Sequence, residues 1–532
     1  MGGAGFTEGF DPDWPGSGRL GPGQVARLLR LPEPTSEQAA VIAAPLGPLA
    51  VIAGAGSGKS ETMAARLVWL VANGLVRPDR VLGLTFTRKA AAELAERVRS
   101  RLTLLRRAGL DGSVPRTDAS DDTDPFGGDP VIGTYHAYAG RLVRDHALRE
   151  GLEPSMRLIT PALSWQLAAS TVAAYDGPMD DIVWTPQTVT AAVLELAGDL
   201  AEHLRTDHDV TEIGAWLDAR LAALPGRVPS AVMKIIANQR VREQLLPLVV
   251  AYNNAKRARE VIDYGDQMAL AAVIASRHPE VGAGERSRYQ VVLLDEYQDT
   301  SHAQLVLLRA LFGGGHPVTA VGDPCQSIYG WRGASAGNLR RFTADFPVRP
   351  AAQGSPGLPA PVLVLSTSFR NAGLVLDAAA AVQADLRAEA PDVPRLTAAP
   401  DRGDRGDVTV ALLETVYDEA DWVADQIAGL LHAEPAVRRT GVRGPMAGRP
   451  ACGRRTSPYC AASGRSSFRC ARRSRRVAYL SRWSGSAACS PCLRFRTWWR
   501  RSASCTTPAR LTRSPASSPA PAGVLAPATW SP

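Results

Sequence analysis

The sequence predicts an α/β protein built on a parallel β-sheet. Short apolar runs, such as 49–53 and 291–294, have the length and composition of buried strands. Several of them precede longer segments with helical periodicity, and strands that alternate with helices are typical of parallel sheets. Glycine-rich and acidic patterns directly follow two of the runs, at the sheet edge where α/β proteins bind ligands.

The predicted elements follow one another in a regular order. They are a strand at 49–54, a helix at 59–74, a strand at 81–86, a helix at 87–102, a polar loop at 112–130, a strand and turn at 131–137, mostly helix from 140 to 285, and strands within 289–300 and 317–327. A second α/β segment follows, with strands in 361–370 and 406–414 and a helix at 418–431. Gly74 closes the first of these helices.

These elements predict several regions along the chain. They are a flexible N-terminus at 1–24, a first α/β domain at 25–140 and 286–350, a helical insertion at 141–285, the start of a second α/β domain at 351–434, and an Arg/Ser/Pro/Ala-rich tail at 435–532. The tail lacks the aliphatic residues that a core needs, which predicts disorder.

The positive charge of the chain is concentrated in this tail. The formal net charge is +8, but 19 arginines and no acid lie between Ala436 and Pro532, so the preceding residues are net acidic. A nucleic-acid site in the body must therefore be a local groove. Cys325 is the only cysteine before the tail, no signal sequence is visible, and no apolar run reaches the roughly 18 residues of a membrane span. We expect a cytoplasmic protein without a membrane segment.

Residues 53–60, "AGAGSGKS", lie between a strand and a helix and predict a phosphate-binding loop. Small residues let backbone N–H groups approach a phosphate, and the N-terminus of the following helix adds positive potential. Lys59 can reach the β- and γ-phosphates, and Ser60 can ligate Mg²⁺. The alternative is a glycine-rich turn that contains GKS by chance.

A second pattern, "VVLLDEYQDT" at 291–300, places two acids at the end of a buried strand. A Mg²⁺·ATP site needs a carboxylate for the metal at the carboxyl end of a neighbouring strand. Asp295 fits that role, and Glu296 fits a general base that orients the attacking water. A solvated turn is the alternative reading.

Taken with other motifs, these residues resemble the UvrD/Rep/PcrA type of superfamily 1 DNA helicases. The resembling segments are "TSEQAAVI", "AGAGSGKS", "TFTRKAAAELAERV", "GTYHAYAGRLVR", "VIDYGDQM", "LLDEYQDTSHAQ", "VGDPCQSIYGWRGA" and "LSTSFRN". They cover about residues 30 to 430. The sequence departs from the family at Arg88, where Asn is usual, at Cys325, where an acid is common, and at Phe369, where Tyr is frequent.

The resemblance implies a role for each motif residue, with ATP and Mg²⁺ as cofactors. The implied catalytic residues are Lys59, Asp295, Glu296, Gln326 and Arg370. The implied ATP-binding residues are Gln38, Ala53, Gly54, Ala55, Gly56, Ser57, Gly58, Lys59, Ser60 and Phe369, with Ser60 and Asp295 on the metal. The implied DNA-binding residues are Thr85, Phe86, His136, Trp331 and Arg332. Phe86 and Trp331 can instead be core aromatics, and His136 an ordinary residue at a strand end.

The resemblance also implies an architecture and partners. The first α/β domain would be a RecA-like P-loop NTPase motor, and the second an incomplete RecA-like domain. The full-length form would move 3′ to 5′ on single-stranded DNA and act at duplex junctions. Residues 39–74 are most similar to the actinobacterial AdnAB-like group, which pairs two helicase-like subunits, so a second helicase-nuclease subunit is a further expected partner.

The family resemblance ends near residue 435. Motifs V and VI of the family are not found, and the tail reads as a truncated or frame-disrupted sequence, because shifting the reading frame of a back-translation gives segments that look like the family. A basic tail that binds nucleic acid is the alternative. Three functions stay open: a UvrD-type helicase with impaired activity, a non-motor DNA-binding partner subunit with a vestigial ATPase, and an ATPase that acts on RNA.

Overall fold

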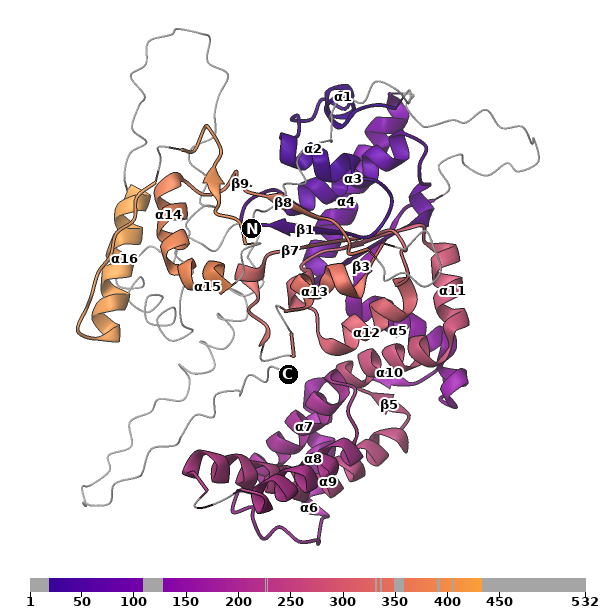
Figure 1. Ribbon diagram of the computed structural model, residues 1–532, viewed down its shortest axis with the longest axis vertical. Helices are drawn as coiled ribbons and strands as arrows, with labels where there is room; N and C mark the ends of the chain where they lie inside the picture. Colours follow the sequence, from indigo (N-terminus) through magenta and orange to yellow (C-terminus); the bar gives the residue numbers. More distant parts are fainter. Residues whose placement is uncertain are drawn as a thin grey trace, which may run out of the picture. The chain divides into compact units, whose positions relative to one another are not determined.

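The computed structural model describes residues 19–108, 128–224, 226, 228–330, 333–334, 337–348, 358–389, 393–403 and 406–432 (Figure 1). The chain divides into two compact units, Met1–Val408 and Thr409–Pro532. The predicted tail lies outside the described residues, as does most of the predicted polar loop.

The first unit contains a parallel sheet, as the sequence predicts, and this sheet has six strands. Its strand order is β3-β2-β6-β7-β1-β8. The strands are β1 (Leu49–Ala53), β2 (Val81–Thr85), β3 (Val131–Thr134), β6 (Val291–Leu294), β7 (Val318–Gly322) and β8 (Val362–Leu365). Every residue of β1, β2, β6 and β7 is buried, because helices cover both faces, and this explains their continuous apolar sequence.

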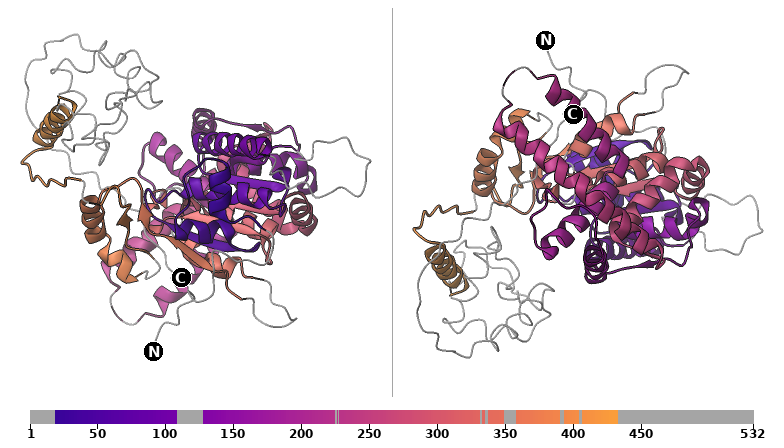
Figure 2. Two further views of the ribbon diagram at one scale, coloured as in Figure 1. Left: turned by 90° about the horizontal axis from the view of Figure 1, so that it is seen from above. Right: turned by 90° about the horizontal axis from the view of Figure 1, so that it is seen from below.

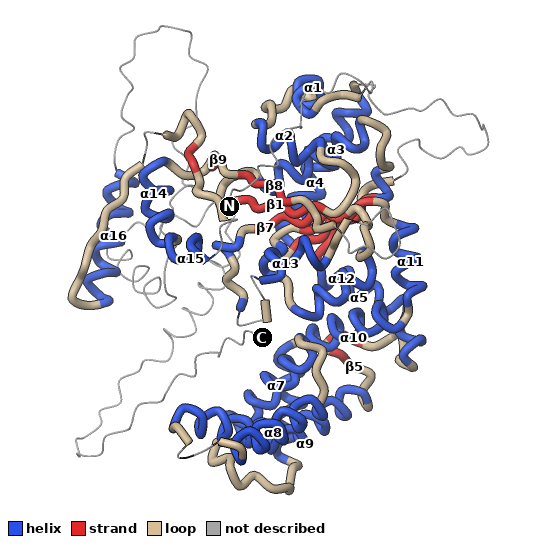
Figure 3. Tube along the Cα trace, viewed as in Figure 1, coloured by secondary structure: helices blue, strands red, loops and turns tan. Residues whose placement is uncertain are grey.

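Helices form one layer on each face of the sheet (Figures 1 and 3). The first layer consists of α1 (Pro22–Leu28), α2 (Ser36–Ala43), α3 (Lys59–Ala72) and α4 (Arg88–Arg107). The second consists of α5 (Tyr135–His146), α10 (Tyr264–Arg277), α11 (Pro279–Arg288), α12 (His302–Phe312) and α13 (Gly337–Asp345). Alternate residues of β6 enter the two cores: Val291 and Leu293 pack with the first layer, and Val292 and Leu294 with the second.

Four helices between α5 and α10 in the sequence form a separate cluster, next to the second layer (Figure 1). They are α6 (Pro161–Ala173), α7 (Pro186–Glu202), α8 (Asp207–Ala222) and α9 (Ser230–Arg257). Their core contains Leu167, Val193 and Tyr252. The short strands β4 (Arg157–Leu158) and β5 (Val261–Ile262) pair in parallel beside it. Figure 2 (right) shows these helices from below.

The helical insertion is shorter than the predicted range 141–285. Leu142 and Val143 of α5, Met268 of α10 and Val281 of α11 all belong to the core of the sheet. The sequence does not separate these helices from the insertion because both are amphipathic, and only the packing partner distinguishes them.

The predicted domain boundary at residue 351 is wrong for the strand at 362–365. We expected it to open a second sheet, but β8 pairs with β1, with Ala50 opposite Val362 and Ala53 opposite Leu365. It therefore completes the edge of the first sheet. A buried parallel strand has the same sequence in either sheet, and the pairing depends on which edge is available.

Smaller elements follow β8. They are β9 (Thr367–Ser368), α14 (Gly373–Val382), α15 (Ala384–Glu389) and β10 (Thr397–Ala398), and β9 pairs in parallel with β10. The strand predicted at 406–414 does not form: Val410 and Leu412 are 91% and 100% exposed. A strand needs a partner for its backbone, and none is seen for this segment within the described residues.

Two predictions at the ends of the described chain have different outcomes. The predicted helix at 418–431 is present as α16 (Val416–His432), in the second unit. At the other end, α1 begins at Pro22, inside the range expected to be a flexible N-terminus, and the Gly21 N–H donates to Gln24 Oε1 at 2.8 Å. No helix among the described residues combines the length and apolar character that a membrane span requires.

Candidate nucleotide and metal site

The phosphate loop joins β1 to α3 at the carboxyl edge of the sheet. Gly56 and Gly58 have φ values of 78° and 81°, in the left-handed region that glycine adopts without strain. Inside the loop, the Ser57 hydroxyl donates to the Gly54 carbonyl at 2.8 Å. Lys59 is the first residue of α3, and the first N–H groups of a helix have no partner within it. This arrangement confirms the strand–loop–helix geometry that the sequence predicts.

Two further loop residues were predicted to bind ATP or its metal. Ala53 is the last residue of β1 and has no exposed surface, so its side chain cannot touch a ligand in this structure. Ser60 is the second residue of α3 and is partly exposed. The loop between the two elements therefore runs from Gly54 to Gly58.

The acidic pair lies at the end of β6, beside the phosphate loop. Glu296 has a positive φ of 51°, which turns the chain out of the strand into a short 3-10 helix (Tyr297–Asp299). Its Oε2 lies 3.3 Å from Lys59 Nζ. Asp295 is 4% exposed, and its Oδ2 lies 3.4 Å from the Thr85 hydroxyl, a long contact between neighbouring strand ends. Residues far apart in the sequence thus form one cluster.

Burial and charge perturb the pKa of two carboxyl groups in this cluster. Burial, and then the negative charge of Glu296, raise the pKa of Asp295 to about 6, although Lys59 and the Thr85 hydroxyl act in the opposite direction. The same two causes raise the pKa of Asp299 to about 6. A nearby cation would lower both values, so the site favours a positively charged ligand.

The residues present fit a Mg²⁺ ion. Asp295 Oδ1 is buried and has no protein partner among the described residues, so the carboxylate keeps a free oxygen for a ligand. The described residues hold no cluster of three or more His, Cys, Asp or Glu that could bind a metal. Mg²⁺ commonly uses one or two protein ligands together with phosphate oxygens and water, which matches a site of Asp295 and Ser60.

A chain of hydrogen bonds connects Glu296 to the end of β7. Gln298 Nε2 donates to Glu296 Oε2 at 2.8 Å, and Gln298 Oε1 accepts from the Asp323 N–H at 3.0 Å. Asp323 Oδ2 in turn accepts from Gln326 Nε2 at 2.6 Å. This chain brings the predicted Gln326 into the cluster. Gln298 and Asp323 were not predicted as site residues, although both stand in the segments "LLDEYQDTSHAQ" and "VGDPCQSIYGWRGA".

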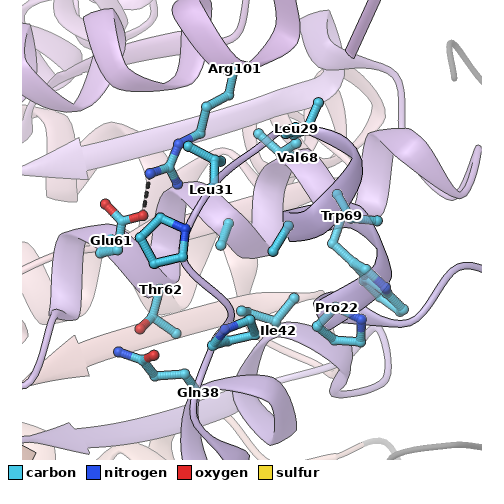
Figure 4. A pocket seen from close by; sticks show the side chains of 15 residues that line it. Pro22, Leu29, Leu31, Gln38, Ile42, Glu61, Thr62, Val68, Trp69 and Arg101 are labelled. Atoms are coloured by element: carbon cyan, nitrogen blue, oxygen red, sulfur yellow. Dashed lines mark hydrogen bonds and ion pairs between the residues drawn. The ribbon is translucent and has the colours of Figure 1, made fainter. Parts of the chain in front are cut away.

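Gln38 lies on the other side of the phosphate loop. Its Nε2 donates to the Ser57 carbonyl at 3.2 Å, and its Oε1 accepts from the Thr35 N–H in a capping box at the start of α2. Figure 4 shows a pocket beside it, with Ile42 and Thr62 nearby and an ion pair between Glu61 and Arg101 on its wall. Recognition of adenine by Gln38 stays a prediction.

Arg370 and Phe369, predicted to contact ATP, follow β9 and lie against the phosphate loop through their backbone. The Phe369 N–H donates to the Gly56 carbonyl at 2.9 Å. A Cβ atom on Gly56 would lie 2.5 Å from the Cβ atom of Arg370. Phe369 is 41% exposed and Arg370 is exposed as well, so both side chains are available to a ligand.

The predicted DNA-binding residues have different outcomes. Phe86 stacks on Tyr329 with ring centroids 4.7 Å apart, and His136 meets Tyr264 edge to face at 5.8 Å. Thr85 is fully buried next to Asp295, which contradicts its expected place in a DNA groove: the end of the strand turns this side chain towards the carboxylate. The two remaining residues, Trp331 and Arg332, lie outside the described residues.

Comparisons with known proteins point to one family. The sequence matches the UvrD/REP helicase N-terminal domain over residues 34–347. It is 26% identical over 395 residues to the ATP-dependent DNA helicase PcrA of Leuconostoc citreum, covering 74% of this chain and 44% of that protein. It is 28% identical over 311 residues to DNA helicase II of Escherichia coli, covering 58% of this chain and 36% of the relative.

A third relative extends the match further along the chain. The ATP-dependent DNA helicase UvrD1 of Mycobacterium bovis is 28% identical over 419 residues, covering 77% of this chain and 46% of the relative. The chain thus spans less than half the length of these relatives. Since the family match covers more than half of the chain and includes the phosphate loop and the acidic pair, the protein belongs to the UvrD/REP helicase family.

Proposed function

We propose that this chain binds Mg²⁺·ATP and hydrolyses it as the motor part of a DNA helicase. The observation that carries the proposal is the ion pair of Lys59 with Glu296 beside the free oxygen of Asp295. A cation for phosphate, an acceptor for a proton and an oxygen for a metal are the three groups that phosphoryl transfer to water needs. The relatives named as ATP-dependent DNA helicases support this choice.

Each residue of the cluster has a role in this proposal. Lys59 binds the β- and γ-phosphates, and Asp295 with Ser60 holds the metal ion, which neutralises phosphate charge when it is bound. The Lys59 ammonium turns from Glu296 towards the phosphates when ATP enters. Glu296 then has a free oxygen with which to accept a proton from the attacking water, while Gln298 fixes the orientation of its carboxylate.

The remaining motif residues respond to the γ-phosphate. Gln326 is joined to Glu296 through Gln298 and Asp323, so a change at the phosphate reaches the loop that follows β7. Arg370 supplies a second positive charge to the transferring phosphoryl group. Gln38 and Phe369 are proposed to contact the adenine base from either side of the loop.

Single-stranded DNA is the proposed track, with movement from 3′ to 5′ and a preference for duplex junctions. The pairs Phe86–Tyr329 and His136–Tyr264 place aromatic rings beyond the ends of β2 and β3, and aromatic platforms suit sequence-independent binding of bases. Trp331 and Arg332 follow Tyr329 directly in the sequence and are proposed to extend this surface.

We further propose that unwinding by this chain is weak, because motifs V and VI of the family are not found in its sequence. A second helicase-nuclease subunit remains a proposed partner, and the cytoplasm the proposed location. The alternative is a DNA-binding subunit with a vestigial ATPase. The intact set of Lys59, Asp295, Glu296, Gln326 and Arg370 favours an ATPase, since a vestigial site has no need to keep them.

Nucleotide binding by the full chain and by Lys59→Ala tests the proposal. A fluorescent ATP analogue with Mg²⁺ should bind the unmodified chain, and loss of Lys59 should weaken binding at least about tenfold, the effect of roughly 1.4 kcal/mol. Lys234→Ala, which removes an exposed lysine of α9, is the matched control and should bind like the unmodified chain. Equal binding by all three proteins would contradict the proposed site.

A further inference from the structure

Glu37, in the first turn of α2, binds the segment that leads to Arg370. Its Oε2 accepts from the backbone N–H of Ser366 at 2.9 Å and from that of Thr367 at 3.3 Å. Its Oε1 accepts from the Ser366 hydroxyl. One carboxylate therefore holds three donors at the point where the chain leaves β8. Hydrogen bonds to an ionised acceptor are about twice as strong as neutral ones.

The same segment is attached to the phosphate loop on its other side. Ser368 Oγ donates to the Ala55 carbonyl at 2.9 Å, and the Phe369 N–H donates to the Gly56 carbonyl at 2.9 Å. A Cβ atom on Gly56 would lie 2.8 Å from Ser368 Oγ. The segment and the loop are thus in direct contact, and a glycine is needed for them to approach so closely.

Helix α2 itself is firmly held, so Glu37 lies on a fixed support. The Thr35 side chain caps its N-terminus. At the C-terminus, the guanidinium of Arg66, which is 1% exposed, donates to the carbonyl groups of Val41, Ile42 and Ala44 at 2.8 to 3.1 Å. These bonds satisfy carbonyl groups that a helix end leaves unpaired.

We propose that Glu37 is a positioning residue, which fixes residues 366–370 on the phosphate loop so that Arg370 reaches the γ-phosphate. The inference rests on the proposed ATPase function and adds to it a residue that touches no nucleotide. Without Glu37, the two N–H groups and the hydroxyl lose their acceptor, and the segment keeps its bonds to the loop and the pairing of β9 with β10 but loses its attachment to α2. Arg370 then occupies its catalytic position for a smaller fraction of the time.

The test compares the full chain with Glu37→Ala, Glu37→Gln and the control Glu33→Ala, which removes an exposed acid paired with Arg27. Hydrogen exchange of the Phe369 amide reports on the segment. The affinity for Mg²⁺·ADP measures ordinary nucleotide binding. The affinity for Mg²⁺·ADP with fluoroaluminate measures binding of a complex that mimics the transferring phosphoryl group. We expect Glu37→Ala to speed the exchange and to weaken the fluoroaluminate complex about tenfold while ADP affinity stays unchanged.

Glu37→Gln keeps an acceptor oxygen for the two N–H groups. Its Phe369 exchange rate and its affinity for the fluoroaluminate complex should therefore be close to those of the unmodified chain. Ser366→Ala removes one donor only and should give a smaller effect, which keeps the test decisive if Glu37→Ala does not fold. Unchanged exchange, or equal weakening of both complexes, would overturn the inference. If the unmodified chain binds neither nucleotide complex, the proposed function fails, and the exchange data alone decide whether Glu37 holds the segment.

Discussion

Lys59 and Glu296 are 237 positions apart in the sequence and form an ion pair of 3.3 Å in the folded chain. The parallel sheet creates this pair, because β1 and β6 both end at the same edge, with β7 between them. The lysine side chain is only 12% exposed, so the pair is better shielded from water than an ordinary surface ion pair. It joins the group proposed to bind phosphate to the group proposed to activate water.

Glu296→Gln is expected to separate nucleotide binding from hydrolysis. The amide keeps the shape of the side chain but cannot accept a proton, so single-turnover hydrolysis with DNA present should fall at least about 100-fold. Nucleotide affinity should change little, because Lys59 and Asp295 remain. Glu212→Gln, at an exposed position of α8, is the matched control. Hydrolysis at the unmodified rate would exclude Glu296 as the base.

Gln298→Leu is expected to disconnect Glu296 from Asp323. The substitution leaves the buried Asp323 N–H without its acceptor, which costs about 1–3 kcal/mol of folding free energy. Hydrolysis should also decline, because the Glu296 carboxylate loses the donor that orients it. Urea unfolding and hydrolysis measured on the same preparation would check both effects. A variant with normal stability and normal turnover would show that this chain of hydrogen bonds is dispensable.

Metal binding is expected to weaken below about pH 6. Mg²⁺ needs the ionised Asp295, whose pKa of about 6 means that protons compete for it there. In the metal-free chain, this raised pKa gives a stabilising contribution that is fully present below the ordinary pKa of an aspartate and is lost as pH rises through 6. Asp299 contributes in the same direction.

The stabilisation of the chain by Mg²⁺·ADP should therefore be larger at pH 7.5 than at pH 5.5. Thermal unfolding at both pH values, with and without the ligand, measures it. Asp295→Asn should remove most of the pH dependence of this difference. If the ligand stabilised the protein equally at both pH values, proton competition at Asp295 would be ruled out.

Arg66→Met is expected to destabilise the first unit. The buried guanidinium, whose pKa burial lowers to about 10, donates to carbonyl groups at the end of α2, and methionine removes these hydrogen bonds. We expect a loss of about 2 kcal/mol or more in the free energy of unfolding. Arg395→Ala, which breaks an exposed ion pair with Asp377, should cost less than about 1 kcal/mol. Similar losses in the two variants would argue against this role.

The tail after residue 435 is expected to be an out-of-frame sequence. Sequencing the gene across the codons for residues 425 to 460, and on to the next stop in every frame, tests this. One added or missing base that restores family motifs V and VI would support the prediction. The same open frame in several independent isolates would count against it and favour a basic segment that binds nucleic acid.

The sequence by itself determined the fold class and located the two motifs that form the candidate site. Apolar runs that alternate with helices predicted the parallel sheet, and the patterns at 53–60 and 291–300 predicted the phosphate loop and the acidic pair, which the fold brings together at one edge. These predictions succeeded because the sequence signals are local: the residues that form the loop or end the strand are adjacent in the chain.

Tertiary structure alone decided which residues pair across the fold. Strand β8 pairs at the edge of the first sheet, and α10 and α11 pack into the core of that sheet. The Thr85 hydroxyl lies towards Asp295. The contact of Glu37 with Ser366 spans 329 positions. Sequence periodicity reports which face of an element is apolar, but it carries no information about the partner of that face. That choice is made only when distant segments compete for the same surface during folding.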